Sequence, residues 1–279
     1  MNLLKVMTFN IRGSCKEDGV NIWENRANLN VQTIQTYNPD LIGFQELQQG
    51  NLETYQDQLT GYDYSLGNAY NREGRKLYNA IFWKSEQFKL VKNGSFYLSE
   101  TPKQWSTSWE SARVRCANWA ILEDLRNQFQ FLHFNTHLDH LSVTARQEGI
   151  KLIIQQLANL RGDNTPVILT GDFNSYLRLA DNKLQSVDGV YSLLINAEFK
   201  DIYLTVGNRD IPGQHTVHNF LGKGYGVEDQ QEVHRIDWIM TLRGDRILTP
   251  KRCKIIEDAQ PPLYPSDHYP VLAELEIEQ

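Results

Sequence analysis

Two polar side chains close an apolar run at residues 169–175, which read LTGDFNS. Asp172 and Asn174 stand two positions apart directly after the run. Side chains two residues apart in an extended segment point to the same side of the chain, so the pattern predicts that this carboxylate and this carboxamide face one site. A carboxylate held at the end of a rigid strand can bind a cation, accept a proton or orient a water molecule.

The same arrangement recurs at five other places along the chain. The polar residues that stand at the ends of these apolar runs are Asn10, Glu46, His137, Asp237 within RIDWIM, and Asp267 with His268. Sites in open α/β sheets lie at strand ends, because the loops there are free of the core while the strands hold them in place. We therefore expect these side chains to converge on one site.

Each of these residues also has an ordinary structural interpretation. Asn10 can cap a turn, and GD or SD pairs often form helix caps or Asx turns. Glu46 can form an ion pair at a rim, lone histidines are commonly satisfied core residues, and Asp237 can pair with its neighbour Arg235. The structural interpretation is favoured for any one position, but six independent strand ends of this type favour a shared site.

The residue types indicate the chemistry of that site. Carboxylate and carboxamide oxygens are hard ligands that suit Mg²⁺ or Mn²⁺ and match a tight zinc site poorly. Histidine beside acidic partners can donate a hydrogen bond to a developing phosphoryl oxyanion. The sequence contains no G-x-S-x-G elbow, no glycine-rich phosphate loop and no HExxH helix. The chemistry indicated is metal-assisted attack of water on a phosphate ester.

The elements that must position these residues begin with a β-α-β unit. A strand over 3–12 ends at Asn10, a helix that starts near Glu24 is stopped by the pair Asn38-Pro39, and a second strand over 40–46 ends in Glu46. Strands then dominate the chain. They are expected at 79–84, 88–99, 118–125, 165–172, 235–242, 252–258 and 268–277, with a hairpin over 124–138 that turns near Asn127.

Two further helices are predicted in the second half of the chain. One covers 144–160, where Thr144 and Gln147 have capping-box spacing, and a short one lies within 186–197. The segment 175–189 is interpreted as a loop. Sheets covered by helices, in a single domain over 1–279, are the expected architecture.

Composition and charge describe an ordinary globular protein. The 279 residues are 41% hydrophobic and 22% charged, and 34 acidic against 28 basic residues give a net charge of −6, so a long-range attraction for nucleic acid is not visible. Three widely spaced cysteines without a CxxC pair predict free thiols. The sequence shows no secretory signal and no apolar run long enough to cross a bilayer, which predicts a cytoplasmic protein without a membrane partner.

Six motifs in this order resemble the endonuclease/exonuclease/phosphatase superfamily, the deoxyribonuclease I-like proteins, in their bacterial branch. They are FNIRG, GFQE, NTHLDH, GDFNS, RIDWI and SDHYPV, and they span the chain from Asn10 to Val271. The resemblance implies a four-layer α/β/β/α sandwich, in which two mixed sheets pack face to face with helices outside.

The resemblance also implies roles for the strand-end residues. The metal would be held by Glu46, Asn10 and Asp267, and Asp172 would orient or deprotonate the attacking water, with Asn174 positioning the water or the phosphate. The remaining residues implied are His268, which would contact the scissile phosphate, Asp237, which would orient its ring, His137, a second phosphate-binding histidine, and Arg115, which can clamp a phosphate or form a structural ion pair. Trp23 and Arg26, in the segment DGVNIWENR, are interpreted as structural.

One position departs from the pattern. Many members carry a glutamate just before the Tyr-Asn of the strand that here reads KLYNAIFW, where it can orient the first histidine, but this chain has Leu77. Asp139 and Glu73 are the candidates to take its place beside His137.

The sequence thus predicts a Mg²⁺- or Mn²⁺-dependent phosphoesterase that acts on a phosphate-ester substrate as a monomer. A phosphodiesterase or nuclease, with single-stranded nucleic acid as one candidate partner, is the first choice. A phosphomonoesterase on an inositol or sugar phosphate is the second. A non-catalytic binding module that kept the fold is the rival from another class.

Overall fold

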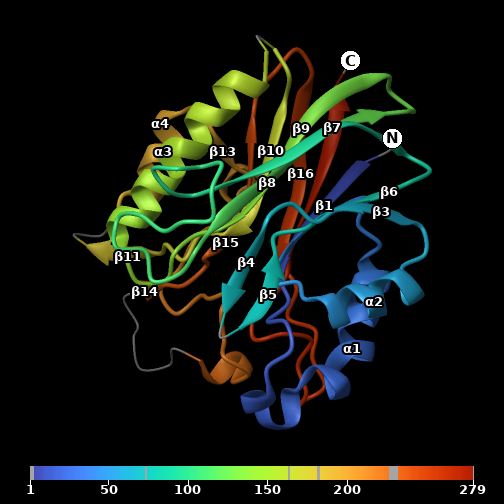
Figure 1. Ribbon diagram of the computed structural model, residues 1–279, viewed down its shortest axis with the longest axis vertical. Helices are drawn as coiled ribbons and strands as arrows, with labels where there is room; N and C mark the ends of the chain where they lie inside the picture. Colours follow the sequence, from blue (N-terminus) through green and yellow to red (C-terminus); the bar gives the residue numbers. More distant parts are fainter. Residues whose placement is uncertain (1–2, 73, 163, 181–182, 226–231, 279) are drawn as a thin grey trace.

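The fold consists of two β-sheets packed face to face with helices on their outer sides (Figure 1). The computed structural model describes residues 3–72, 74–162, 164–180, 183–225 and 232–278. Each of the two main sheets formed by these residues has six strands and contains both parallel and antiparallel pairs. The predicted four-layer α/β/β/α sandwich is confirmed.

The first sheet brings the two ends of the described chain together, because the last strand pairs antiparallel with the first. The strand that follows the first helix pairs parallel with the first strand, which confirms the predicted β-α-β unit. The order of this sheet is β16 (Ile247–Ile255), β17 (Val271–Glu278), β1 (Leu3–Asn10), β2 (Leu41–Gln45), β6 (Ile81–Lys84) and β3 (Tyr62–Ser65).

The second sheet contains the predicted hairpin, which turns at residues 125–128. Its order is β13 (Lys200–Asp201), β15 (Asp237–Leu242), β10 (Val167–Asp172), β9 (Phe129–His137), β8 (Cys116–Asp124) and β7 (Phe88–Tyr97). Smaller pairings join β12 (Lys183–Ser186), β11 (Leu177–Ala180) and β14 (Glu232–Val233), and join β4 (Ala69–Arg72) with β5 (Arg75–Tyr78).

Helices bury apolar stripes on the outer face of each sheet. The first sheet is covered by α1 (Trp23–Tyr37) and α2 (Gln49–Gln58), and the second by α3 (Val143–Leu160) and α4 (Val190–Asn196) (Figure 1). The short helices are α5 (Ile202–Thr205) and the 3₁₀ turns η1 (Lys16–Asn21) and η2 (Gly222–Gly224). Among the described residues, no helix combines the length and the apolar character needed to span a bilayer.

The inner faces of the two sheets change from apolar to polar along the strands. On β1, Leu4 and Val6 belong to the core between the sheets, whereas Thr8 and Asn10, on the same face, are buried polar residues. On β9, Phe131 belongs to that core, and His133, Asn135 and His137 follow at alternate positions. The same alternation on β10 leads from Ile168 through Thr170 to Asp172. The polar residues therefore gather at one end of the interface between the sheets.

A buried amide joins the two sheets in this polar region. Asn135 Nδ2, on β9, donates to the carbonyl oxygens of Phe44 at 2.7 Å and of Ala80 at 2.9 Å, both from the first sheet. Its Oδ1 accepts from Gln45 Nε2 at 2.7 Å. The close approach explains Gly43, because a Cβ there would lie 2.1 Å from Thr170 Oγ1. The sheets are held in register at the level of the candidate site.

The elements differ from the predictions in three places. The segment 175–189, predicted as a loop, contains β11 and β12, which are only four residues long and pair with each other through the main chain. The capping box at Thr144 is wrong: α3 begins at Val143 with Ser142 as its N-cap, whose hydroxyl accepts from the Ala145 N–H at 3.1 Å. Helix α2 was not predicted, because its sequence is mostly polar.

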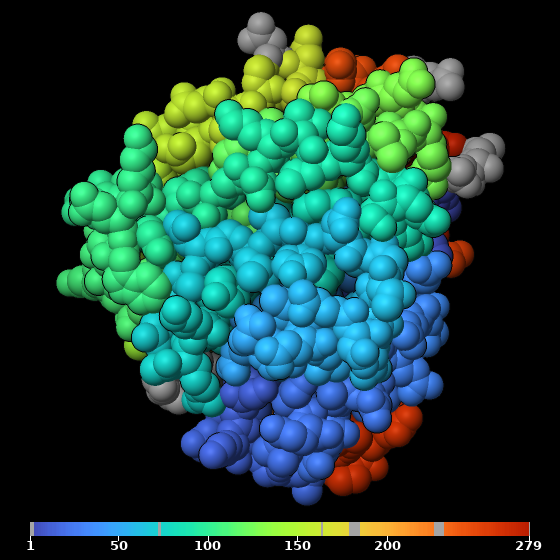
Figure 2. Space-filling model, turned by 45° about the vertical axis from the view of Figure 1, so that its right-hand side comes forward, coloured from blue at the N-terminus to red at the C-terminus, as the bar shows by residue number. Residues whose placement is uncertain are grey.

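Segments from both ends of the chain meet on one side of the molecule. In Figure 2, atoms of the C-terminal part (red) lie against those of the N-terminal part (blue) at the lower end. The contact includes Asn21, whose Nδ2 donates to the carbonyl oxygen of Pro262 at 3.1 Å and whose Oδ1 accepts the Tyr264 N–H at 2.8 Å. The three cysteines are buried free thiols, as predicted.

Candidate functional site

Asp172, the last residue of β10, is the centre of the buried polar region. Its side chain is almost fully buried, and its Oδ2 accepts from Asn10 Nδ2 at 2.9 Å. His137 Nε2 lies 3.3 Å from the same oxygen and His268 Nε2 lies 3.9 Å from it. Strand-end residues from both sheets therefore meet at one carboxylate.

Asp237, the first residue of β15, forms a second carboxylate beside the first. The antiparallel register pairs it with Asp172, and its Oδ2 lies 2.9 Å from His268 Nδ1. Thr216 Oγ1 fixes the backbone here by accepting the N–H groups of Ile236 and Asp237 at 3.0 and 3.2 Å. Within the described residues, Asp237 Oδ1 is buried without a hydrogen-bond partner. Asp237 thus pairs with His268, and Arg235 pairs with Asp201 and Asp210 instead.

The electrostatics of the group favour a proton on Asp172 and a positive charge on His268. Burial raises the pKa of the Asp172 carboxyl to about 7, with help from the charge of Asp237 and against the effect of His268 and the Asn10 hydrogen bond. Burial opposes the charge of His268, but the charge and hydrogen bond of Asp237, with the charge of Asp172, outweigh it and raise the pKa of the imidazolium to about 10. The group can hold and move protons near neutral pH.

Asn10 and Asp267 lie next to each other at the edge of the group. The hydroxyl of Ser266 donates to the Asn10 carbonyl oxygen at 2.6 Å, which places Asp267 beside the end of β1. Arg12 Nε lies 3.6 Å from Asp267 Oδ2, and the Arg12 N–H donates to Asn10 Oδ1 at 3.0 Å. Although burial opposes it, Asp267, Asp18 and Glu46 raise the pKa of Arg12. Both Asp267 and Glu46 are therefore close enough to stabilise this guanidinium.

Glu46 follows β2 in a left-handed conformation. Its φ is 61°, its side chain is largely buried, and its N–H donates to the Tyr70 hydroxyl at 3.2 Å. The parallel register of β1 and β2 pairs Asn10 with Gln45, so Glu46 emerges beside the chain that leads from Asn10 to Arg12. The three residues predicted to hold a metal thus come from adjacent positions of one sheet edge.

Asn174 does not occupy the position predicted for it. Side chains two positions apart point to the same side only in an extended segment, but β10 ends at Asp172 and Asn174 has a φ of 47°. Its N–H donates back to Asp172 Oδ1 at 3.0 Å, which is the Asx turn named as the structural alternative. Its Nδ2 donates to the Leu138 carbonyl oxygen at 3.0 Å, so the side chain links the loops after β9 and β10.

Arg115 forms a long ion pair, the structural role predicted as one alternative, and keeps a donor that is not hydrogen-bonded within the described residues. It is buried, its Nε lies 3.9 Å from Asp139 Oδ2, and its guanidinium carbon lies 5.9 Å from the centroid of the Tyr70 ring. The ion pair is loose, and Arg115 Nε has no hydrogen-bond partner among the described residues. The guanidinium is therefore held near the site with donor capacity to spare.

Asp139, one of the two candidates for the missing carboxylate beside His137, does not take that place. It accepts hydrogen bonds from Ser111, from the backbone of Ala112, and from the backbone of Leu141 and Ser142, so it organises the loop before α3. The other candidate, Glu73, lies outside the described residues. Among the described residues, His137 has the Asp172 carboxylate on one side and, edge to face at 6.3 Å, the ring of Tyr70.

Two sets of donors fit a hard divalent cation. Asp172, Asp237 and His268 each offer an atom within 4.8 Å of the others, and the unpartnered Oδ1 of Asp237 adds an acceptor. Asn10, Glu46 and Asp267 form the second set, which consists of oxygen donors only, the type that Mg²⁺ and Mn²⁺ prefer. Sequence reasoning named all six residues but assigned the first three to catalysis.

Three residues of the site were not recognised as such from the sequence. Arg12 stands inside the motif FNIRG, and its positive charge between acidic strand ends was a usable signal. Thr216 carries no such signal, because only the folded backbone brings it to Asp237. Tyr70, which is 1% exposed, lies in a hairpin that was not predicted from the sequence.

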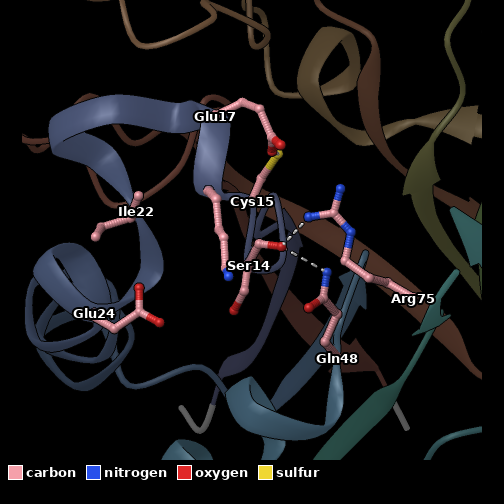
Figure 3. A pocket seen from close by; sticks show the side chains of 8 residues that line it. Ser14, Cys15, Glu17, Ile22, Glu24, Gln48 and Arg75 are labelled. Carbon is pink, nitrogen blue, oxygen red and sulfur yellow. Dashed lines mark hydrogen bonds between the residues drawn. The ribbon is translucent and has the colours of Figure 1, made fainter. Parts of the chain in front are cut away.

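A cavity of about 690 Å³ lies beside the loop that follows β1. Figure 3 shows its lining, in which Arg75 Nη1 and Gln48 Nε2 both donate to the Ser14 carbonyl oxygen, at 2.8 and 3.2 Å. Cys15 and Glu17 line one side, and Ile22 and Glu24 line the other. The link to the site is Gly13, where a Cβ would lie 2.8 Å from the Glu46 carbonyl oxygen. The cavity is lined by side chains of both charges and has room for a small molecule.

Comparisons with known proteins agree with this geometry. The model of the Endonuclease/Exonuclease/phosphatase family matches residues 7–268. A solved endonuclease/exonuclease/phosphatase of Bacteroides vulgatus is 28% identical, with all of both chains covered and a TM-score of 0.82. The mannosyl-6-phosphatase of Bacteroides thetaiotaomicron is 29% identical over 98% of this chain and 99% of that chain, with a TM-score of 0.81. TDP2 of D. rerio, solved with a single-strand DNA product, is 15% identical over 99% and 100% of the two chains, with a TM-score of 0.72, and shows the fold alone.

Proposed function

Because the chain belongs to the Endonuclease/Exonuclease/phosphatase family, we propose that it is a divalent-metal-dependent phosphoesterase that hydrolyses its substrate with an activated water molecule. The observation that carries the proposal is the buried carboxylate of Asp172, in contact with Asn10 and His137 and within 3.9 Å of His268. Its pKa of about 7 suits a group that must accept a proton from water near neutral pH.

The proposal assigns proton handling to the Asp172 side of the site. Asp172 orients and deprotonates the attacking water. His268, charged up to about pH 10, donates hydrogen bonds to the phosphoryl oxygens, and Asp237 orients its ring through the 2.9 Å contact. His137 and Arg115 add donors on the other side of the phosphate, and Asn174 holds the loop beside Asp172.

The metal is assigned to the oxygen donors of Asn10, Glu46 and Asp267. A histidine must be neutral to bind a metal, and His268 keeps its proton to about pH 10, so the group of Asp172, Asp237 and His268 suits a cation less well. When bound, Mg²⁺ or Mn²⁺ would polarise the phosphoryl group and neutralise the charge that develops on it. Arg12 lies beside Asp267 and supplies a fixed positive charge at the same edge.

The substrate we favour is a phosphomonoester of a sugar, ahead of the nucleic-acid phosphodiester that the sequence placed first. The related mannosyl-6-phosphatase is similar over almost the whole chain. Asp172 and Asp237 are at most 1% exposed, and a terminal phosphate can enter such a recess without carrying a second chain segment with it. The net charge of −6 disfavours a long polyanion, and the cavity beside the loop after β1 offers charged side chains that can bind a hydroxylated group.

A panel of phosphate esters tests the activity and ranks the substrates. Mannose 6-phosphate, an inositol phosphate, bis(p-nitrophenyl) phosphate and single-stranded DNA would each be incubated with Mg²⁺, with Mn²⁺ and with EDTA. We expect metal-dependent release of inorganic phosphate, fastest from the sugar monoester. Faster cleavage of DNA, with a steep loss of rate as salt is added, would restore the phosphodiesterase. A metal titration without any binding would favour the non-catalytic binding module.

The proposal includes a single domain that works as a monomer in the cytoplasm. All proposed site residues lie on one chain, from Asn10 to His268, so no partner is needed to complete the site. Sedimentation at the mass of one chain and recovery of activity in the cytosolic fraction would support this part. Activity that falls on dilution would contradict it.

A further inference from the structure

The hairpin of β4 and β5 carries none of the predicted site residues, yet one of its side chains lies against three of them. Tyr70 is 1% exposed and is paired by register with Leu77, the residue that departs from the family pattern. Tyr70, Leu77 and Cys116 form a small apolar cluster, and Tyr97 and Val114 pack against it. The hairpin is thereby fixed against the second sheet at Cys116, the first residue of β8.

The ring and the hydroxyl of Tyr70 make different contacts. The hydroxyl accepts the N–H of Glu46 at 3.2 Å. The ring meets His137 edge to face, with centroids 6.3 Å apart and planes at 84°. The guanidinium carbon of Arg115 lies 5.9 Å from the ring centroid. One side chain therefore touches residues proposed to bind the metal and residues proposed to bind the phosphate.

The hydrogen bond between the Glu46 N–H and the Tyr70 hydroxyl stabilises an unfavourable backbone conformation. A non-glycine residue with a φ of 61° is held in a region that is unfavourable for L-residues, and a buried N–H without an acceptor would add a further cost. The Tyr70 hydroxyl supplies the acceptor. Burial, and then the charge of Glu46, keep the pKa of Tyr70 well above its usual value, so the hydroxyl stays neutral across the working pH range.

We propose that Tyr70 is a positioning residue, whose hydroxyl holds the backbone of Glu46 in its left-handed conformation and whose ring orients His137 and Arg115. Its consequences for activity rest on the proposed function. The Tyr70 ring, packed against Leu77, lies beside His137, and the Tyr70 hydroxyl holds the backbone from which the Glu46 side chain projects.

The Tyr70→Phe variant tests the hydroxyl, because it keeps the ring and removes one oxygen. We expect Mn²⁺ to bind about tenfold more weakly in a titration without substrate. The metal concentration that gives half-maximal activity should rise by the same factor, with kcat recovered at saturating metal. Tyr70→Leu, which also removes the ring, should lower kcat at every metal concentration. A loss of fold alone would instead lower Tm and leave the metal dependence unchanged.

Tyr62→Phe is the matched control. Its hydroxyl also bonds a backbone group, here by donating to the carbonyl oxygen of Pro39, but it lies on β3 and has no hydrogen bond to a proposed site residue among the described residues. Unchanged Mn²⁺ affinity in Tyr70→Phe, or an equal loss in Tyr62→Phe, would overturn the proposal. If the wild-type protein bound Mn²⁺ but hydrolysed nothing, the proposed function would fail while the positioning role stood. If it bound no Mn²⁺, the φ of Glu46 in a crystal structure of Tyr70→Phe would decide, and an unchanged left-handed value would overturn the role.

Discussion

Arg235 and Asp237 lie two residues apart on the chain, and each belongs to its own buried group of charged side chains. Arg235 contacts Asp201 at 2.6 Å and Asp210 at 2.6 and 2.8 Å, and every oxygen of both carboxylates accepts a hydrogen bond. Asp237 contacts His268 through Oδ2, while its Oδ1 lacks a hydrogen-bond partner within the described residues. Both groups contain two carboxylates and one cation.

The groups differ in which buried atom lacks a hydrogen-bond partner among the described residues: a donor, Arg235 Nη1, in the first group and an acceptor, Asp237 Oδ1, in the second. Around Arg235, burial opposes the positive charge, but both aspartates raise the pKa of the guanidinium, so its positive charge stays fixed. Around Asp237, the neighbouring Asp172 has its pKa raised to about 7 by burial and by Asp237 itself. A group that serves the fold uses all its acceptors, whereas a group that serves chemistry keeps acceptors and protons available. The predictions below test this distinction.

The largest effect is expected for Asp172→Asn. The variant loses the group that accepts a proton, so kcat should fall by about 10³ to 10⁵. The folded-state pKa of Asp172 lies above its unfolded value, so its contribution to stability is present at low pH and is lost as pH rises through about 7. At pH 8, without metal, the neutral variant should therefore unfold at the same or a higher temperature. If Asp172→Asn clearly lowered the unfolding temperature, the group around Asp237 would stabilise the fold as the group around Arg235 does, and the distinction between the two groups would fail.

Arg235→Met should reverse this pattern. Removal of one partner from a buried charge group leaves the others uncompensated, so the free energy of unfolding should fall by about 3 to 5 kcal/mol. Denaturant titration measures the loss, and kcat per folded molecule at low temperature should stay within about twofold. A large drop in kcat at full folding would show that the Arg235 group also serves the reaction.

Asp237→Asn should move the pH dependence of the reaction. The pKa of His268 is raised above its unfolded value, so its contribution to stability is full below about pH 6.5 and is lost as pH rises through about 10. Without the charge of Asp237, the effect of burial prevails and the pKa of His268 falls. The alkaline limb of the kcat/KM profile should shift to lower pH by about one unit or more. A profile that keeps its alkaline limb would separate His268 from the reaction.

Asn174→Gly should have the smallest effect. Glycine accepts the φ of 47° without strain, but the hydrogen bond from Nδ2 to the Leu138 carbonyl oxygen is lost. The free energy of unfolding should fall by about 0.5 to 1.5 kcal/mol, and kcat by about tenfold or less. Chemical denaturation and initial rates measure the two effects. A loss of activity as large as that of Asp172→Asn would give Asn174 a direct part in the reaction.

The fold was predictable where strands are buried on both faces. The strands that end at Asn10, Gln45 and Asp172 read as apolar runs, and the helix after the first strand stops at Asn38-Pro39 as expected. The predictions failed where strands are only four residues long, in β11 and β12, and where a helix is mostly polar, in α2. Loop hydrogen bonds from Asp139 also moved the start of α3 to Val143, which local spacing could not show.

The sequence predicted which residues lie at the site better than it predicted the contacts between them. The search for polar residues at strand ends identified Asn10, His137, Asp172, Asp237 and His268, and these residues do lie together. The position of Asn174 could not be derived, because the chain turns left-handed there and the alternation ends. Tyr70 was missed because its contacts depend on how a hairpin packs across β8 and β2, which no local pattern encodes.

The contact between the two sheets, which the Asn135 amide bridges, also determines when the proposed site can form. Asn10 and Glu46 belong to the first sheet, and Asp172 and Asp237 belong to the second. His268 directly precedes β17, the last strand, which pairs with β1. A nascent chain on the ribosome that has emerged as far as β15 holds most of the reactive groups but cannot assemble them. The proposed site is thus incomplete until synthesis has passed residue 268 and the two sheets have packed together.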